Sequence, residues 1–154
     1  MSEEVVNNIK DNKLRAQIFE FPETVETVLK ASQLIKEPPE SIVKTLLVKT
    51  KLNEYLALIV RGDRKVDNIK LSNYLGCDFK LASADEVLNI LKVPLGAVSP
   101  LLKNILVLRR VVDPKILEKK YVICGGGTLK ALVKISTEDL IKFLNGPEIV
   151  DVFK

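Results

Sequence analysis

The sequence predicts an α+β fold with a mixed, largely antiparallel sheet. More segments have the pattern of strands than of helices, and short polar turns separate several of these strands. A purely parallel sheet needs a helix at every crossover, and the sequence lacks them. The chain has 154 residues and no internal repeat, low-complexity tract or long linker. We therefore expect a single domain over residues 1–154.

The predicted helices have recognisable start and stop signals. The first is an amphipathic segment, and the second follows Thr24 and ends before a pair of prolines. Asp67 can cap the third, and Ser83 with Glu86 forms a capping box for the fourth. Ser136 opens the last in the same way. The predicted helices are residues 4–14, 24–34, 67–75, 83–91 and 136–144.

The predicted strands are short apolar segments bounded by turn residues. The two longest adjacent ones are joined by a polar turn at residues 50–54, which is typical of an antiparallel pair. The predicted strands are residues 17–21, 42–49, 55–60, 78–81, 105–110, 121–124, 129–135 and 148–152.

The composition excludes several classes of protein. The chain has no His, so it cannot contain a His-based catalytic triad or a His zinc site. Its two cysteines suggest a reducing, cytoplasmic environment, and no apolar run is long enough to span a bilayer. An aromatic content of 5% argues against a platform for stacking many bases, while a net charge of +4 favours an anionic partner.

Lys44 is the most unusual residue because it lies inside an apolar strand. The period of two places it on the face of Ile42, Leu46 and Val48, and the other face is also mostly apolar. A lysine in such a strand is costly unless it opens onto a cleft or meets an anion. The alternative is an edge-strand lysine that points outward and opposes aggregation.

Two glycine-containing segments can offer backbone N–H groups to a ligand. The loop from Gly96 to Pro100 has small residues, which let a substrate approach N–H groups that stabilise an oxyanion. The Gly-Gly-Gly-Thr segment at residues 125–128 follows a predicted strand and can form a nest for a phosphate or carboxylate. The alternatives are an ordinary tight loop for the first segment and a bulge or hairpin for the second.

These features occur in a fixed order, and the ordered set resembles the YbaK/ProX family of aminoacyl-tRNA deacylase domains. The similarity extends from about residue 19 to residue 151. The family includes the editing insertion domain of bacterial-type prolyl-tRNA synthetases and free-standing proteins that act in trans. The matching features are Ile42-Val-Lys-Thr-Leu46, Gly62-Asp63, Leu81-Ala-Ser-Ala-Asp-Glu86, Gly96-Ala-Val-Ser-Pro100, the glycine triplet and the helix start at Ser136.

The resemblance implies a compact, mostly antiparallel, barrel-like sheet flanked by helices, acting on mischarged tRNA. Lys44 matches the family's lysine most closely tied to activity, and Gly96 begins the matching loop that shapes the aminoacyl pocket. An aromatic residue before the first helix often contacts substrate, a place that either Phe19 or Phe21 can fill. The other predicted substrate-binding residues are Ser99, Pro100, Gly125, Gly126, Gly127 and Thr128.

The chain also departs from the family at two places. Family members often continue the Ser-Pro pair with Phe-Gly, where this chain has Leu101-Leu102. The residues after the glycine triplet, Thr-Leu-Lys at 128–130, match no clear consensus. Both differences can reshape the pocket and change which amino acid is removed.

The expected function is that of a free-standing trans-editing hydrolase for a small amino acid, with Ala- or Cys-tRNA for Pro as the expected substrate. An aminoacyl ester is already activated, so positioning and an oxyanion donor suffice without a cofactor or metal. The expected partners are the 3′ end of an aminoacyl-tRNA and a prolyl-tRNA synthetase, with no membrane. Two alternatives are a catalytically silent module that binds an RNA end or nucleotide, and a non-catalytic partner subunit of a synthetase.

Overall fold

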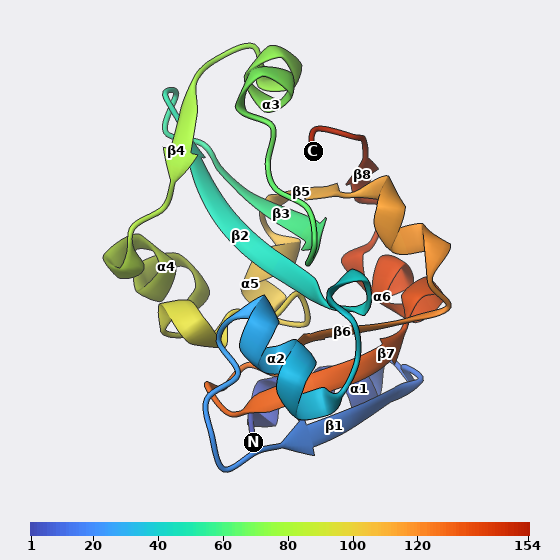
Figure 1. Ribbon diagram of the computed structural model, residues 1–154. Coiled ribbons are helices and arrows are strands. Elements are labelled where there is room, and N and C mark those ends of the chain that lie inside the picture. The colour runs from blue at the N-terminus through green and yellow to red at the C-terminus, as the bar shows by residue number, and fades with distance from the viewer.

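The computed structural model describes residues 1–154, and helices cover two sheets on several sides (Figure 1). None of the helices has the length and apolar character needed to cross a membrane. The helices are α1 (Glu3–Asp11), α2 (Val28–Ile35), α3 (Asn68–Leu75), α4 (Ala84–Leu91), α5 (Lys103–Leu106) and α6 (Thr137–Leu144). The strands are β1 (Ala16–Glu20), β2 (Val43–Thr50), β3 (Tyr55–Arg61), β4 (Phe79–Leu81), β5 (Arg109–Val112), β6 (Tyr121–Gly125), β7 (Ala131–Ser136) and β8 (Glu148–Ile149). Short 3₁₀ helices lie at Pro39–Ser41, Leu95–Ala97 and Pro114–Glu118.

The strands form two sheets of different size. Strands β1, β7 and β6 form a three-stranded antiparallel sheet in that order, and the larger sheet has the order β4-β2-β3-β5-β8. In the larger sheet β4, β2 and β3 are antiparallel neighbours, whereas β5 and β8 pair in parallel. The predicted α+β class with mixed, largely antiparallel pairing is therefore confirmed.

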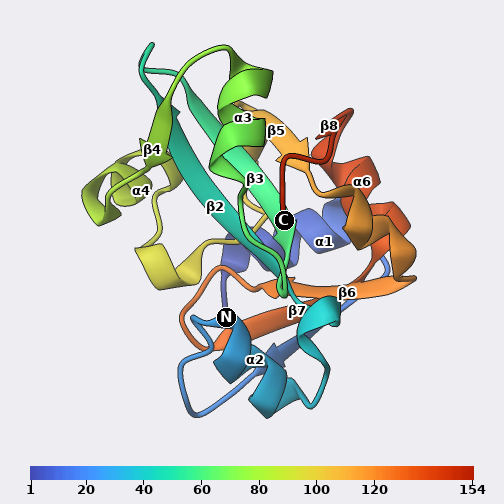
Figure 2. The same cartoon turned by 45° about the horizontal axis from the view of Figure 1, so that its top comes forward.

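The two sheets meet near the start of β2 and do not close into a barrel. A single parallel bridge joins Ile42, directly before β2, to Ile123 of β6. Figures 1 and 2 show the smaller sheet crossing below β2 and β3, with α2 beside the junction. The barrel-like sheet implied by the family resemblance is thus a pair of open sheets that are linked at one point.

The larger sheet is buried on both faces, as the apolar pattern of its central strands predicts. One face packs toward the smaller sheet and α1, α4, α5 and α6, with Ile59 and Ile135 in this core. The other face packs beneath α3 and the C-terminal residues, where Leu58, Leu71 and Phe153 are fully buried. Each such side chain contributes about 1.5–3 kcal/mol when it leaves water, so β2 and β3 are fixed from both sides.

Three predicted helix starts are confirmed by their capping contacts. The Ser83 hydroxyl accepts from the Glu86 N–H while the Glu86 carboxylate accepts from the Ser83 N–H, completing the capping box. Asp67 accepts two backbone N–H groups at the start of α3, and Ser136 accepts one at the start of α6. These side chains satisfy donors that the first turn of a helix leaves unpaired.

The second helix begins later than the predicted cap at Thr24. Its cap is Thr27, whose hydroxyl accepts from the N–H of Lys30 at 3.1 Å. The N–H of Val25 donates instead to the carbonyl of Leu129 at 2.8 Å, which holds residues before α2 against the turn that leads into β7. A long-range backbone contact therefore overrides the earlier threonine as a cap.

The predicted strand over residues 105–110 is wrong over residues 105–108. Residues 103–106 form α5, and strand geometry begins only at β5. The guanidinium of Arg110 donates to the carbonyls of Leu106 and Leu108 at 2.7 and 2.5 Å, which stabilises the turn between the two elements. The apolar run itself does not distinguish a buried helix from a buried strand, because both lack polar alternation.

Candidate active site

A cleft of about 480 Å³ opens beside the first half of β2, where the two sheets meet. Its walls come from the start of α2, the end of β4, the 3₁₀ turn at Leu95–Ala97 and the end of β6. Hydrophobic residues make up 14 of the 20 that line it, so each polar or charged group in it is conspicuous. The other lining residues are Glu26, Thr27, Lys44, Thr45, Gly96 and Gly125.

The cleft borders a free edge of β2. This strand pairs with β3 over residues 43–49, whereas β4 covers only residues 48–50. The carbonyl of Leu47 accepts from the N–H of Ala82 at 2.9 Å, so the odd-numbered residues of β2 turn their backbone groups away from β3. By the alternation along an antiparallel strand, the N–H and C=O of Thr45 face the cleft.

Lys44 lies on the opposite face of β2 from Thr45 and lines the same cleft, which wraps around the strand edge. It stands opposite Val60 of β3, is half-buried, and has no carboxylate within ion-pair distance. Burial lowers the pKa of Lys44 below its usual value; Lys65 lowers it further, and Asp63 offsets part of the effect. Lys44 thus belongs to a strand with a free edge, as the alternative interpretation of the sequence expected, but this edge borders a cleft.

The loop that begins at Gly96 has a lining part and an anchoring part. Gly96 and Val98 line the cleft, whereas Ser99 and Pro100 are buried beneath them. The Ser99 hydroxyl accepts from the N–H of Leu101 at 3.1 Å, which holds the loop against the core. The structure thus places Gly96 and Lys44 in the lining of one cleft, and it places Ser99 and Pro100 outside it.

The glycine triplet also has a part that lines the cleft and a part that does not. Gly125 lines the cleft, where a side chain would overlap the carbonyl group of Val98. The N–H of Gly126 donates to the carbonyl of Ala131 at 2.9 Å, and Gly127 has a φ of +87°, so these two form the β6–β7 hairpin turn. Thr128 follows in this turn and does not line the cleft.

The two candidate aromatic residues lie outside the cleft. Phe19 stands opposite Leu132 in the β1–β7 pair. Phe21 packs against a small cluster that includes Val25 and Leu132, both of which line the cleft. Phe21 therefore supports the cleft wall from behind, and Phe19 does not reach it.

Three lining residues were not selected from the sequence. Thr45 has a buried hydroxyl without a hydrogen-bond partner, and Glu26 is the cleft's one carboxylate. Cys124 is fully buried, and burial raises the pKa of its thiol to about 12, so it is a neutral wall residue and not a thiolate nucleophile. Of these three residues, only Thr45 could have been identified from the sequence, because it is adjacent to Lys44. The other two are brought to the cleft by long-range packing.

Comparison with known families identifies the chain. The family model for the aminoacyl-tRNA editing domain matches residues 22–143, which include all of the lining residues described above. The chain belongs to the aminoacyl-tRNA editing domain family. Its activity is accordingly that of an aminoacyl-tRNA deacylase, a hydrolase that removes an amino acid from tRNA.

Relatives of this editing domain include proline–tRNA ligases. It is 32% identical over 102 residues to the enzyme of Staphylococcus aureus (strain bovine RF122 / ET3-1), covering 64% of this chain and 18% of the ligase. The identity is 33% over 103 residues for the enzyme of Thermotoga neapolitana, covering 66% of this chain and 17% of that one. The chain therefore spans less than a fifth of these relatives.

Two solved structures match the editing domain over nearly its whole length. The hypothetical protein APE2540 has a TM-score of 0.88 and 30% identity, with 99% of this chain and 100% of that chain covered. A protein proposed to be a trans-editing enzyme for prolyl tRNA synthetase has a TM-score of 0.86 and 23% identity, with 100% and 99% covered. The second likeness shows the fold alone.

The first departure of the editing domain from the family pattern falls outside the cleft. Leu101 and Leu102 are both buried in the main core, and the Leu101 carbonyl accepts from the side-chain amide of Asn8 at 2.7 Å. The second departure lies closer to the site, because the side chain of Leu129 is next to Gly96, although Leu129 itself does not line the cleft. The Leu-Leu pair thus supports the loop of Gly96 from the core, and Leu129 lies against that loop at Gly96.

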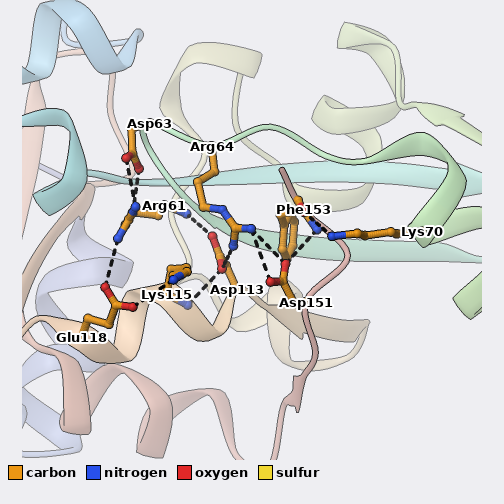
Figure 3. Close-up of polar contacts among 9 residues, drawn as sticks. All are labelled: Arg61, Asp63, Arg64, Lys70, Asp113, Lys115, Glu118, Asp151 and Phe153. Carbon is orange, nitrogen blue, oxygen red and sulfur yellow. Dashed lines mark hydrogen bonds and ion pairs between the residues drawn. The ribbon is translucent and has the colours of Figure 1, made fainter.

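A buried ion-pair network fixes the segment that follows β3 (Figure 3). Asp113 is fully buried and accepts from the Arg64 guanidinium at 2.6 Å and from the Arg61 N–H at 3.2 Å. Arg64 also pairs with Asp151 of the C-terminal segment at 3.1 Å. Removing one member of a buried pair typically costs about 3–5 kcal/mol, so the network holds this segment rigidly.

The same segment carries the two charges that act on Lys44. Asp63 is held by the Arg61 guanidinium at 2.6 Å, which lowers the pKa of Asp63 and keeps it ionised. Lys65 exchanges two backbone hydrogen bonds with Lys154, both at 2.8 Å. The predicted last strand, residues 148–152, is consequently shortened, because the chain leaves β8 to pair beside the segment after β3.

Proposed function

We propose that this editing domain hydrolyses the ester of a small amino acid at the 3′ end of tRNA, with Ala- or Cys-tRNA for Pro as the substrate. The observation that supports this most directly is Lys44, an ammonium without a protein partner in a mostly apolar cleft. The end of an aminoacyl-tRNA has the complementary pattern, because phosphates lie beside a small acyl group.

Lys44 binds the tRNA end in this proposal. A lysine ammonium is a compact point charge that suits a phosphate, and low local polarity strengthens the attraction. The apolar wall formed by residues such as Val98 and Leu132 receives the amino-acid side chain. Editing is needed because a synthetase pocket discriminates one methylene by only about 1–3 kcal/mol.

The chemical step needs little from the protein. Water attacks the acyl carbon, the bond from that carbon to the ribose oxygen breaks, and one proton of the water passes to that oxygen, so the products are the free amino acid and a ribose hydroxyl. Negative charge develops on the acyl oxygen, and the backbone N–H of Thr45 and the charge of Lys44 stabilise it. A covalent step through Cys124 is excluded in this scheme, because its thiol is neutral and buried.

The predicted residues outside the cleft have supporting roles in this proposal. Ser99 and Pro100 hold the loop that carries Gly96, and Phe21 supports the wall behind the acyl group. Gly126, Gly127 and Thr128 shape the hairpin turn that presents Gly125. The aromatic residue Phe19 contributes only to the packing of β1.

We also propose that the domain acts in trans, in the cytoplasm, on tRNA released by a prolyl-tRNA synthetase. The end-to-end match to a protein proposed to be a trans-editing enzyme for prolyl tRNA synthetase supports this mode of action. The sequence relationship to proline–tRNA ligases supports the choice of tRNA.

The test is a deacylation panel with purified protein. Ala-, Cys- and Pro-esters of tRNA for Pro are compared with Ala-tRNA for Ala, and release of the labelled amino acid is followed. We expect rapid loss of Ala or Cys from tRNA for Pro and little loss of Pro. Equal rates with all four esters, or no rate above the spontaneous one, would contradict the proposed substrate.

A further inference from the structure

The cleft contains one charged group besides Lys44, and this group has no role in the scheme above. Glu26 is the only carboxylate among the lining residues, and it makes no ion pair or hydrogen bond within the protein. Its neighbour Glu23, by contrast, pairs with Lys30 at 2.7 Å and lies outside the cleft. Glu26 and Lys44 have opposite charges in one cleft and do not pair with each other.

The backbone on both sides of Glu26 is held in place, and its side chain is exposed. The hydrogen bond from the Val25 N–H to the Leu129 carbonyl holds the residue before it, and Thr27 caps α2 directly after it. Its side chain lies over Gly96, so that a Cβ at Gly96 would be 2.8 Å from Glu26 Oε2 and 2.9 Å from Glu26 Cβ. The absence of a side chain at Gly96 therefore leaves room for the carboxylate at the cleft.

A carboxylate beside an apolar acyl pocket is suited to bind an ammonium group. An aminoacyl ester carries its α-amino group on the carbon next to the reacting carbonyl, and α-amino groups are largely protonated near neutral pH. A hydrogen bond from this ammonium to a carboxylate is charge-assisted and stronger than a neutral one. With Lys44 on the phosphates, Glu26 on the ammonium would fix the ester between two charges of opposite sign.

We propose that Glu26 binds the α-ammonium group of the substrate and makes the domain specific for esters with a free amino group. This inference rests on the proposed deacylase function. N-acylated aminoacyl-tRNA, in which that nitrogen is a neutral amide, is then a poor substrate even when its side chain fits. Glu26 is a specificity residue in this account and takes no proton from the attacking water.

The test compares two esters and two variants in single-turnover deacylation by the full chain. The wild type should hydrolyse Ala-tRNA about 10- to 100-fold faster than N-acetyl-Ala-tRNA, the range for one hydrogen bond to a charged group. Glu26→Gln should lose that factor on Ala-tRNA and keep the wild-type rate on the acetylated ester. Glu23→Gln, the matched control, should leave both rates unchanged.

Other outcomes would overturn the inference. Equal loss on both esters in Glu26→Gln would indicate a general base or a packing role, and unchanged rates on both would exclude any role. If the wild type hydrolyses neither ester, the proposed function fails, and binding of an alanyl-amide analogue of the tRNA end and of its N-acetyl form is measured instead. In that case, recognition by Glu26 predicts that the wild type binds the analogue with the free amine more tightly than its N-acetyl form. Glu26→Gln should bind the two forms equally.

Discussion

A methyl group added at Gly125 should slow deacylation without removing any functional group. Gly125 ends β6 and faces the backbone of Val98 in the loop of Gly96. The new Cβ would lie 3.3 Å from the carbonyl carbon of Val98 and closer still to its oxygen, whereas ordinary contact begins at 3.4 Å. The obstacle is backbone and not the end of a flexible side chain, so the loop itself must move.

The size of the effect follows from this overlap. Restoring ordinary contact requires the Val98 carbonyl to retreat by about 1 Å, and a misplacement of that size costs about 10²-fold in rate. Overpacking of this kind also destabilises a protein by about 1–3 kcal/mol. We therefore expect Gly125→Ala to be folded, somewhat less stable, and about 100-fold slower in single-turnover deacylation.

A second glycine provides the control for lost stability. Gly146 follows α6 at a φ of +73° and has no atom within 4 Å of an added Cβ, so Gly146→Ala introduces backbone strain far from the cleft. This variant should lose about 1–2 kcal/mol of folding free energy and keep its activity. If Gly125→Ala retains full activity, or if both variants lose activity equally, the loop geometry described above does not control the reaction.

Three further predictions concern the site and the fold. Gly96→Val should abolish turnover and leave the circular dichroism spectrum unchanged, because the new side chain would collide only with the exposed side chains of Glu26 and Leu129. Full activity of this variant would mean that the loop is only structural. The pKa of Glu86 is lowered to about 2, chiefly by the Ser83 N–H, so its charged form stabilises the fold above pH 4.5 and this contribution is lost toward pH 2. Urea unfolding should accordingly show wild type more stable than Glu86→Gln at pH 7 and equal to it near pH 2; a constant difference would refute the pKa assignment. Binding of tRNA should weaken steeply as salt rises, because a net +4 chain with few aromatics depends on phosphate contacts, and salt-independent affinity would contradict this.

The elements set by local chemistry were predictable from the sequence. The capping box of Ser83 and Glu86 and the cap at Asp67 are contacts within one turn of helix, so a short pattern is enough to identify them. The β2–β3 pair follows from two apolar segments joined by a polar turn, and the half-buried position of Lys44 follows from the period of two.

The remaining features depend on contacts between distant segments. Thr27 replaces Thr24 as a cap because Val25 is bonded to Leu129, more than 100 residues away in sequence. The free edge of β2 exists because β4 is only three residues long, which no spacing pattern encodes. Glu26 lies in the segment before α2, and its place beside Gly96 depends on long-range packing that no local pattern encodes.

The most direct test of the central claim is the rate of Ala release from Ala-tRNA for Pro in Lys44→Ala. The variant removes the one cation of the cleft, and losing one electrostatic donor at a developing oxyanion costs about 10²–10³-fold in rate. Lys49→Ala is the control from the same strand, because Lys49 faces Glu86 at 3.3 Å and does not line the cleft. We predict that Lys44→Ala is slower by this factor while Lys49→Ala stays within a few-fold of wild type. Similar rates in the two variants would show that Lys44 is an ordinary strand lysine and that the active site lies elsewhere.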